Sequence, residues 1–191
     1  AGDDVGNYSI TDQGTTTANI TAKTLTATAS ANNKVYDGTT TATVTLTFTG
    51  LVGAETLGQS VGATFADKDV ANGKTVTVNS ITLSDDGDSG GLASNYSIST
   101  GQTTTANITP KALTIGGITA SNKTYNGNTT ATIDVSAATF TGLVDGDAVT
   151  VSATGTFDNE NVGTNKTVTL VETNAGDDVG NYSITDQGTT T

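Results

Sequence analysis

The chain has 191 residues and a formal net charge of −12, with seven lysines and no arginine against sixteen aspartates and three glutamates. Cysteine, histidine, tryptophan and methionine are absent, whereas threonine and glycine contribute 44 and 23 residues. This composition excludes a disulfide framework, the usual zinc and haem sites and a Ser-His or Cys-His catalytic pair, and it makes nucleic acid an unsuitable partner. We therefore expect a protein that is not an enzyme.

The chain begins with a segment that it later repeats. AGDDVGNYSITDQGTTT fills residues 1–17 and recurs without a difference at residues 175–191, which is a shift of 174 positions. A related copy begins at Asn95, and it lies 88 positions after Asn7 and 86 before Asn181. The chain is therefore a tandem repeat of about 87 residues, within a super-repeat of two units that we expect a parent protein to contain many times.

The repeat places boundaries at two equivalent steps, Thr21-Ala22-Lys23 and Thr109-Pro110-Lys111. Residues 1–22 are then the C-terminal tail of a preceding repeat. Residues 23–110 (unit 1) form a complete repeat, and residues 111–191 (unit 2) form a second repeat that lacks its last strand. Such short linkers favour a stiff rod in which each repeat contacts its neighbours. Because the tail has no complete repeat of its own, we also consider that it exchanges as a strand between molecules.

The secondary structure predicted from these residues is almost entirely β. From Thr41 to Thr49 every odd position is threonine, while Val44, Leu46 and Phe48 share the other face, as in a strand with one buried side. No segment has the apolar stripe of an amphipathic helix, and no apolar run approaches the ~20 residues of a membrane span. The strands expected in unit 1 lie near residues 24–31, 41–48, 49–53, 58–66, 74–83, 95–99 and 103–109.

Short strands at this spacing predict an all-β fold of two tandem immunoglobulin-like β-sandwich repeats. A β-grasp-like repeat is the alternative, although it needs a helix that the sequence does not show. The aromatic residues are matched between units, which indicates that they form each small core rather than a sugar-stacking surface. The matched sets are Tyr8/Tyr96/Tyr182, Tyr36/Tyr125, Phe48/Phe140 and Phe65/Phe157.

Charged residues follow two different patterns. Six of the seven lysines are matched between units, and only Lys68 is not, since it stands opposite Glu160. The matching is expected for lysine stems that lie over apolar surface. The alternative interpretation is that these lysines form isopeptide crosslinks. Most carboxylates differ between units, which is typical of solvated turns. Some aspartates are spaced closely enough to bind calcium, but none of these groups forms a complete EF-hand loop. We therefore assign no metal ligand. These acidic residues are Asp67/Asp69, Asp85/Asp86/Asp88 and Asp145/Asp147.

The ordered motifs N-K-x-Y-[D/N]-G-x-T, F-x-G, K-T-V-T, N-Y-S-I and T-A-N-I-T-P-K span nearly the whole chain. Together they resemble the YDG repeat of large bacterial surface adhesins such as the filamentous-haemagglutinin-like proteins. The motif itself is Tyr36-Asp37-Gly38, and Tyr125-Asn126-Gly127 is a variant of it. The resemblance implies a stalk or spacer role without catalytic residues.

The leading hypothesis is therefore a structural stalk repeat of a bacterial adhesin, at the cell surface or secreted, whose partners are neighbouring repeats of the same chain. Such a stalk extends a distal binding region, in settings such as host adhesion or biofilm, and does not itself insert into a membrane. The alternative is an adhesive module that binds a glycan or a host protein through its polar strand faces.

Overall fold

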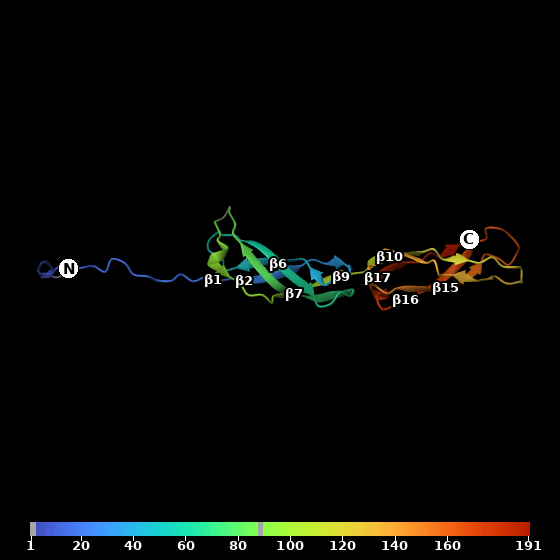
Figure 1. Cartoon of the computed structure of the whole chain (residues 1–191), viewed down its shortest axis with the longest axis horizontal. Helices are drawn as coiled ribbons and strands as arrows, with labels where there is room; N and C mark the ends of the chain where they lie inside the picture. Colours follow the sequence, from blue (N-terminus) through green and yellow to red (C-terminus); the bar gives the residue numbers. More distant parts are fainter. Residues whose placement is uncertain (1–2, 88–89) are drawn as a thin grey trace.

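Two β units follow one another along an elongated molecule, and an extended N-terminal segment precedes them (Figure 1). The computed structural model describes residues 3–87 and 90–191. Its described residues contain three short 3-10 helices, η1 (Val5–Asn7), η2 (Ala93–Asn95) and η3 (Val179–Asn181), and no α-helix. None of these helices is long and apolar enough to cross a membrane. The prediction of an all-β fold of two tandem repeats is confirmed.

Unit 1 has a sandwich-like arrangement of one five-stranded sheet and two separate two-stranded pairs. Its strands are β1 (Lys23–Thr24), β2 (Thr26–Ala31), β3 (Lys34–Val35), β4 (Thr41–Ala42), β5 (Val44–Thr49), β6 (Gly58–Phe65), β7 (Ala71–Ser84), β8 (Tyr96–Ser97) and β9 (Thr103–Thr109). Pairs β1-β8 and β2-β5 make one side, while the other side is a five-stranded sheet in the order β3-β9-β7-β6-β4. Pairs β1-β8 and β3-β9 are parallel, a feature that the sequence pattern did not indicate.

Unit 2 repeats this plan with the same number of strands, several of which are shorter than their counterparts in unit 1. They are β10 (Lys111–Gly116), β11 (Thr119–Ala120), β12 (Thr130–Ala131), β13 (Ile133–Asp134), β14 (Thr139–Thr141), β15 (Thr150–Phe157), β16 (Val168–Ala175), β17 (Tyr182–Thr185) and β18 (Thr189–Thr190). One side has the order β14-β10-β17 and the other β12-β15-β16-β18, with a separate β11-β13 pair. Strand β18 corresponds to only the first part of β9.

The alternating threonines predicted the buried face of one strand correctly. Leu46 is buried, Val44 and Phe48 are partly buried, and the threonines between them are exposed. However, the strand is interrupted at Thr43, because β4 pairs with β6 in one sheet while β5 pairs with β2 in the other. The run therefore changes sheets at this residue, and it carries its apolar side chains into the space between them.

One expected strand is wrong. Residues 50–53 form a loop rather than a strand, because Gly50 and Gly53 have φ values of 108° and 59°, which a strand does not allow. The short strand β3 was in turn missed, since two residues carry no visible periodicity. The loop has a purpose in the fold, because the backbone N–H of Val52 donates to the Tyr96 hydroxyl from within it.

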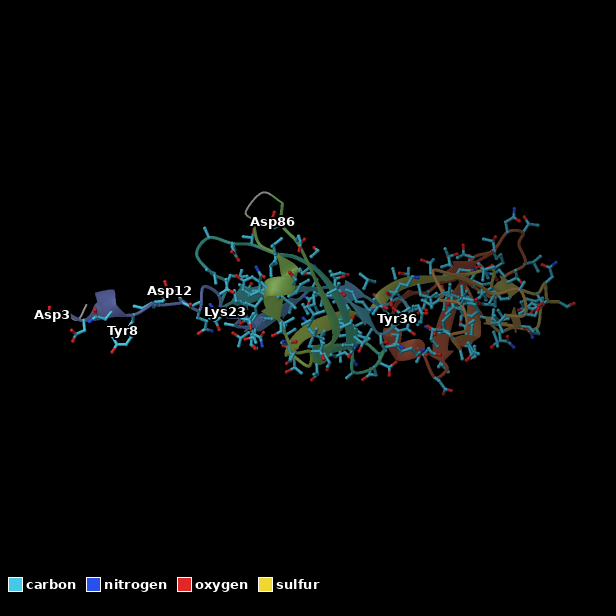
Figure 2. All side chains as sticks on the ribbon, turned by 60° about the vertical axis from the view of Figure 1, so that its left-hand side comes forward. Asp3, Tyr8, Asp12, Lys23, Tyr36 and Asp86 are labelled. Carbon is cyan, nitrogen blue, oxygen red and sulfur yellow. The ribbon has the colours of Figure 1, made fainter. Side chains whose placement is uncertain are left out.

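The N-terminal segment makes little contact with the rest of the chain. Residues 3–22 are exposed throughout, and the side chains of Tyr8 and Ile20 are 73% and 103% exposed. Figure 2 shows Tyr8 and Asp12 projecting from the extended trace, away from unit 1. The segment joins the fold only where β1 pairs with β8.

Candidate functional site: the joint between the units

The two units meet through a buried carboxylate that belongs to unit 2. Asp147 lies in the loop that follows β14, and its side chain is 4% exposed. Tyr36 of unit 1 is 1% exposed, and its hydroxyl lies 2.9 and 3.1 Å from the two oxygens of Asp147. The Tyr182 hydroxyl also donates to Asp147, from the start of β17. Donors from both units thus converge on one carboxylate.

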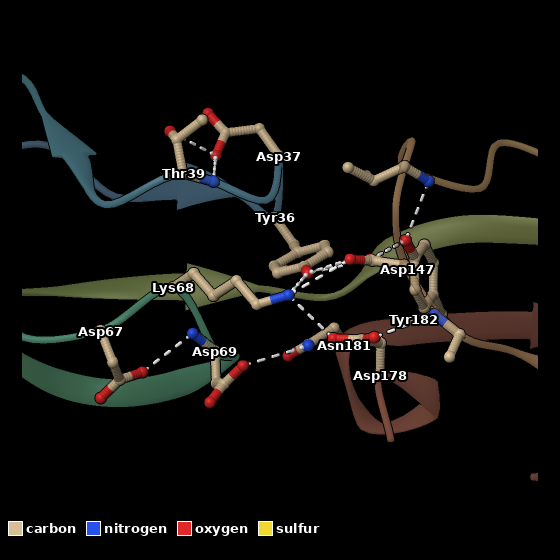
Figure 3. Close-up of polar contacts among 12 residues, drawn as sticks. Tyr36, Asp37, Thr39, Asp67, Lys68, Asp69, Asp147, Asp178, Asn181 and Tyr182 are labelled. Carbon is tan, nitrogen blue, oxygen red and sulfur yellow. Dashed lines mark hydrogen bonds and ion pairs between the residues drawn. The ribbon is translucent and has the colours of Figure 1, made fainter. Parts of the chain in front are cut away.

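Lys68 crosses the same boundary from unit 1. Its Nζ lies 2.8 Å from Oδ1 of Asp178 and 3.2 Å from Oδ1 of Asp147, and it donates to the Tyr36 hydroxyl at 3.1 Å (Figure 3). The ammonium group therefore compensates two carboxylates of unit 2. The Lys68 side chain stays 38% exposed, but the carboxylate of Asp147 is removed from water and needs such hydrogen bonds to offset its desolvation.

Backbone groups fix the orientation of the receiving side chains. The N–H of Val144 donates to the Tyr182 hydroxyl at 2.9 Å, and the N–H of Ala148 donates to Asp178 at 2.9 Å. The rings of Tyr36 and Tyr182 meet edge to face, with centroids 5.6 Å apart and planes at 76°. Such a pair adds directional packing to the polar contacts. We call Tyr36, Lys68, Asp147, Asp178 and Tyr182 the joint.

A second set of contacts lies beside the joint. Asn181 is 5% exposed, accepts a hydrogen bond from the Val70 N–H at 2.9 Å, and donates to Asp69 at 3.3 Å. Val70 packs against an apolar cluster that continues from unit 1 into unit 2, where it includes Leu113 and Val149. Since the same cluster contains core residues of unit 1, the boundary between the units is a shared core and not a flexible linker.

The Tyr36-Asp37-Gly38 turn delivers the tyrosine to this boundary. Asp37 accepts from the N–H of Thr39 at 2.9 Å and from Lys34 Nζ at 2.7 Å, which closes a tight turn. Gly38 has a φ of 76°, and a Cβ at this position would lie 2.8 Å from Cγ1 of Val144 in unit 2. Glycine is therefore required both by the backbone and by the approach of the next unit.

Protonation states in the joint follow from these contacts. Burial, together with Asp147, raises the pKa of Tyr182 to about 12, and burial likewise raises the pKa of Tyr36. The hydrogen bonds to Asp178, Tyr36 and Asp147 raise the pKa of Lys68, while the hydrogen bond from Lys68 lowers the pKa of Asp178. At neutral pH the lysine is therefore charged and the phenols keep their protons, so the hydrogen bonds of the joint are maintained.

The equivalent residues at the outer end of unit 2 are not covered. Tyr125, the counterpart of Tyr36, is 63% exposed, and Val162, the counterpart of Val70, is 88% exposed. The prediction that Tyr125 forms part of a core is therefore wrong, because this position is buried only where another unit follows. At the opposite end, Tyr96 donates to Glu55 and accepts from Val52, as Tyr182 does with Asp147 and Val144.

The prediction that Tyr8 packs in a core is also wrong, since Tyr8 is 73% exposed in the segment before unit 1. The other aromatic predictions fit the structure, as do those for two of the matched lysines. Phe65 and Tyr96 are buried, and Phe48, Phe140 and Phe157 pack partly buried against the cores. Lys34 lies over the Phe65 ring and Lys123 over the Phe157 ring, each with Nζ 5.6 Å from the centroid. These stems cover apolar surface, as predicted from their matching.

The closely spaced aspartates are separated by the fold. Asp67 pairs with Lys74, Asp69 contacts Asn181, and Asp145 is exposed while Asp147 enters the joint. Asp85 accepts from the Ala93 N–H and Asp86 from the Thr56 hydroxyl, whereas Asp88 lies outside the described residues. Across residues 3–87 and 90–191 no group of three acidic side chains is arranged to hold a metal ion. Calcium binding stays an untested hypothesis.

Sequence reasoning did not identify the joint. Lys68 stood out only as the unmatched lysine, and Asp178 was not distinguished from the drifting carboxylates. The usable signal was that both positions differ between the units in a correlated way: unit 2 has Glu160 in place of Lys68, and unit 1 has Leu92 in place of Asp178. Residues that differ together at the two ends of a repeat are candidates for the boundary between repeats.

Comparison with known proteins agrees with the repeat. The family model described as the YDG domain matches residues 21–106 and again residues 109–191. No curated protein and no solved structure gives a significant match.

Proposed function

Because this chain belongs to the YDG domain family, with two tandem copies, we propose that it is a non-catalytic stalk segment of a large bacterial surface adhesin. In this role the repeats hold a distal binding region away from the cell. They act at the cell surface or in a secreted protein, and their immediate partners are neighbouring repeats.

The observation that carries the proposal is the rigid joint. A single residue, Pro110, separates β9 from β10, and the buried Asp147 receives hydrogen bonds from Tyr36 and Lys68 of the other unit. Proline fixes its own φ angle and restricts the residue before it. Repeats that contact only their neighbours, through a fixed interface, add length without flexibility.

The distribution of differences between the units also favours a spacer. Aromatic residues and lysine stems that pack are retained, whereas most acidic surface residues change from one unit to the other. A ligand-binding surface present in each unit needs its contacting side chains to be retained. The high negative charge of such a stalk keeps neighbouring chains apart.

Small-angle X-ray scattering on the complete chain tests the proposal. We expect an extended particle with a fixed angle between the units, and a profile that one rigid arrangement fits. The double variant Lys68→Ala/Asp147→Ala should need an ensemble of inter-unit angles. The double variant Asp12→Ala/Lys23→Ala, which removes the same charges at exposed positions away from the joint, should scatter like the unmodified chain. A compact particle, or equal flexibility in all three proteins, would contradict a stalk.

A further inference from the structure

One extended segment, residues 103–116, passes from unit 1 into unit 2. It consists of β9, Pro110 and β10, so a single residue lies between two strands. Figure 1 shows β9 and β10 following one another along the long axis of the molecule. Because the chain has no cysteine, no disulfide shares the connection between the units. Tension along the molecule therefore crosses the boundary through this backbone and through the contacts of the joint.

Both strands of this segment are held on two edges. Strand β9 lies between β3 and β7, and β10 lies between β14 and β17. The pairing continues up to the residues that flank Pro110. The carbonyl of Thr109 accepts from the Tyr36 N–H at 2.9 Å, and Lys111 pairs with Tyr182. Proline also restricts the residue before it to extended conformations, so the backbone stays extended across the boundary.

Buried side chains oppose any sliding of the segment. Ala106 and Ile108 of β9 and Leu113 and Ile115 of β10 are at most 5% exposed, and they alternate with residues that are not buried. A slip of one residue turns every side chain to the opposite face of a sheet. It would therefore bring this apolar set out of the cores. The strands can move along their length only when pairing and burial are lost together.

The direction of the pairing decides how tension acts on unit 2. Strands β10 and β17 run parallel, with Lys111 opposite Tyr182 and Thr114 opposite Thr185. Tension that enters β10 at Lys111 and leaves after β17 pulls the two strands in opposite senses along their length. The hydrogen bonds between them are then loaded together, whereas those of a hairpin that is pulled apart from its open end break one after another. Unit 1 has the same parallel pair where tension enters it, β1 with β8.

We propose that residues 103–116 carry tension along the stalk, and that each unit resists a pull along the molecule much more strongly than a pull across its strands. The inference rests on the proposed stalk function for its use, because an anchored stalk is what transmits tension. Forced unfolding is governed by the rate of unfolding and not by the equilibrium stability, so one fold can resist two directions of pulling very differently.

Single-molecule force spectroscopy on the complete chain tests the direction of resistance in unit 2. Because the chain has no cysteine, two introduced cysteines at exposed positions define where the force is applied. Thr109→Cys/Thr185→Cys loads unit 2 along β10 and β17, and Thr150→Cys/Ala175→Cys pulls apart the adjacent ends of β15 and β16. We expect a several-fold higher unfolding force for the first variant, although β15 and β16 pair over eight residues and β10 and β17 over four.

Urea denaturation without applied force is the control for this comparison. Each variant loses one threonine hydroxyl that donates to a backbone carbonyl at 3.3 Å, from Thr109 in the first variant and from Thr150 in the second. The two variants should therefore unfold at the same midpoint, and a difference in unfolding force then reports the direction of pulling alone.

Unit 1 permits the same comparison. Thr21→Cys/Thr109→Cys loads it from the residues before β1 to the end of β9, and Ser60→Cys/Thr82→Cys pulls on paired positions near the open end of the β6-β7 hairpin. We again expect the higher force for the pull along the molecule. Equal forces in the two directions, or a higher force across the strands in either unit, would overturn the proposal and leave the stalk standing. A compact particle in scattering would instead contradict the stalk and leave the measured difference in force intact.

Discussion

The hydroxyl of Tyr36 lies 2.9 and 3.1 Å from the two carboxylate oxygens of Asp147, although 111 residues separate them in the chain. The tyrosine belongs to the turn of one unit and the aspartate to a loop of the next. The Asp147 side chain is 4% exposed and is surrounded by donors from both units. The boundary between the repeats is thus as fully hydrogen-bonded as a protein interior.

Tyr36→Phe removes this hydroxyl and leaves the ring in place. The buried Asp147 then loses a donor and Lys68 loses an acceptor, so we expect unfolding to become easier by about 1–3 kcal/mol. Urea denaturation of the complete chain measures the change. Tyr125→Phe is the matched control, since it makes the same change at an exposed position of the other unit, and it should alter stability by less than ~0.5 kcal/mol. Equal effects of the two substitutions would show that Tyr36 acts within unit 1 only.

The glycine of the Tyr-Asp-Gly turn offers a second matched pair. Gly38 and Gly127 have φ values of 76° and 73°, so alanine costs roughly 1 kcal/mol at either position through backbone strain. A Cβ at Gly38 also lies 2.8 Å from Cγ1 of Val144, whereas at Gly127 it meets no atom within 4 Å. We therefore expect Gly38→Ala to destabilise the chain clearly more than Gly127→Ala. Thermal or urea unfolding measures both, and a smaller effect of Gly38→Ala would mean that the joint accommodates the methyl group.

Alkaline pH should weaken the joint. The pKa of Tyr182 is raised from 10.0 to about 12 in the folded chain, so the folded state holds this proton more tightly than the unfolded state. The resulting stabilisation is complete below about pH 10 and is lost as the pH rises through about 12. The raised pKa values of Tyr36 and Lys68 act in the same direction.

Phenolate absorbance during a pH titration measures this shift. The step that Tyr182→Phe removes from the titration curve should lie near pH 12 in the folded protein and near 10 in concentrated urea. A removed step at the same pH in both conditions would show that the hydroxyl is not held by Asp147 in solution.

Local sequence signals predicted most of the fold. The alternation at Val44, Leu46 and Phe48 gave the buried side of β5, because this pattern depends only on the two-residue period of a strand. The change of sheet at Thr43 was not predictable, since it is decided by pairing with strands elsewhere in the chain. The loop at residues 50–53 was mistaken for a strand because its glycines and apolar residues satisfy the same composition rule.

The joint was beyond such signals because its residues serve the contact between units. Tyr36 and Tyr125 look equivalent in the sequence, yet one is 1% and the other 63% exposed. Their repetition indicated that both tyrosines pack in a core. However, the tyrosine at this position is buried only where another unit follows. Lys68 and Glu160 carried the better signal. A position that is a cation in one unit and an anion in the next indicates that the two units end in different surroundings.

This exchange of charge leads to a prediction within the chain. Lys68→Glu places at the joint the residue type that unit 2 has at the equivalent position, beside the carboxylates of Asp147 and Asp178. Like charges then meet where an ion pair stood, so we expect the chain to unfold at a clearly lower urea concentration. Glu160→Lys makes the opposite exchange at an exposed position and should change the midpoint of unfolding much less. If Lys68→Glu unfolds at the midpoint of the unmodified chain, Lys68 does not compensate these carboxylates in solution.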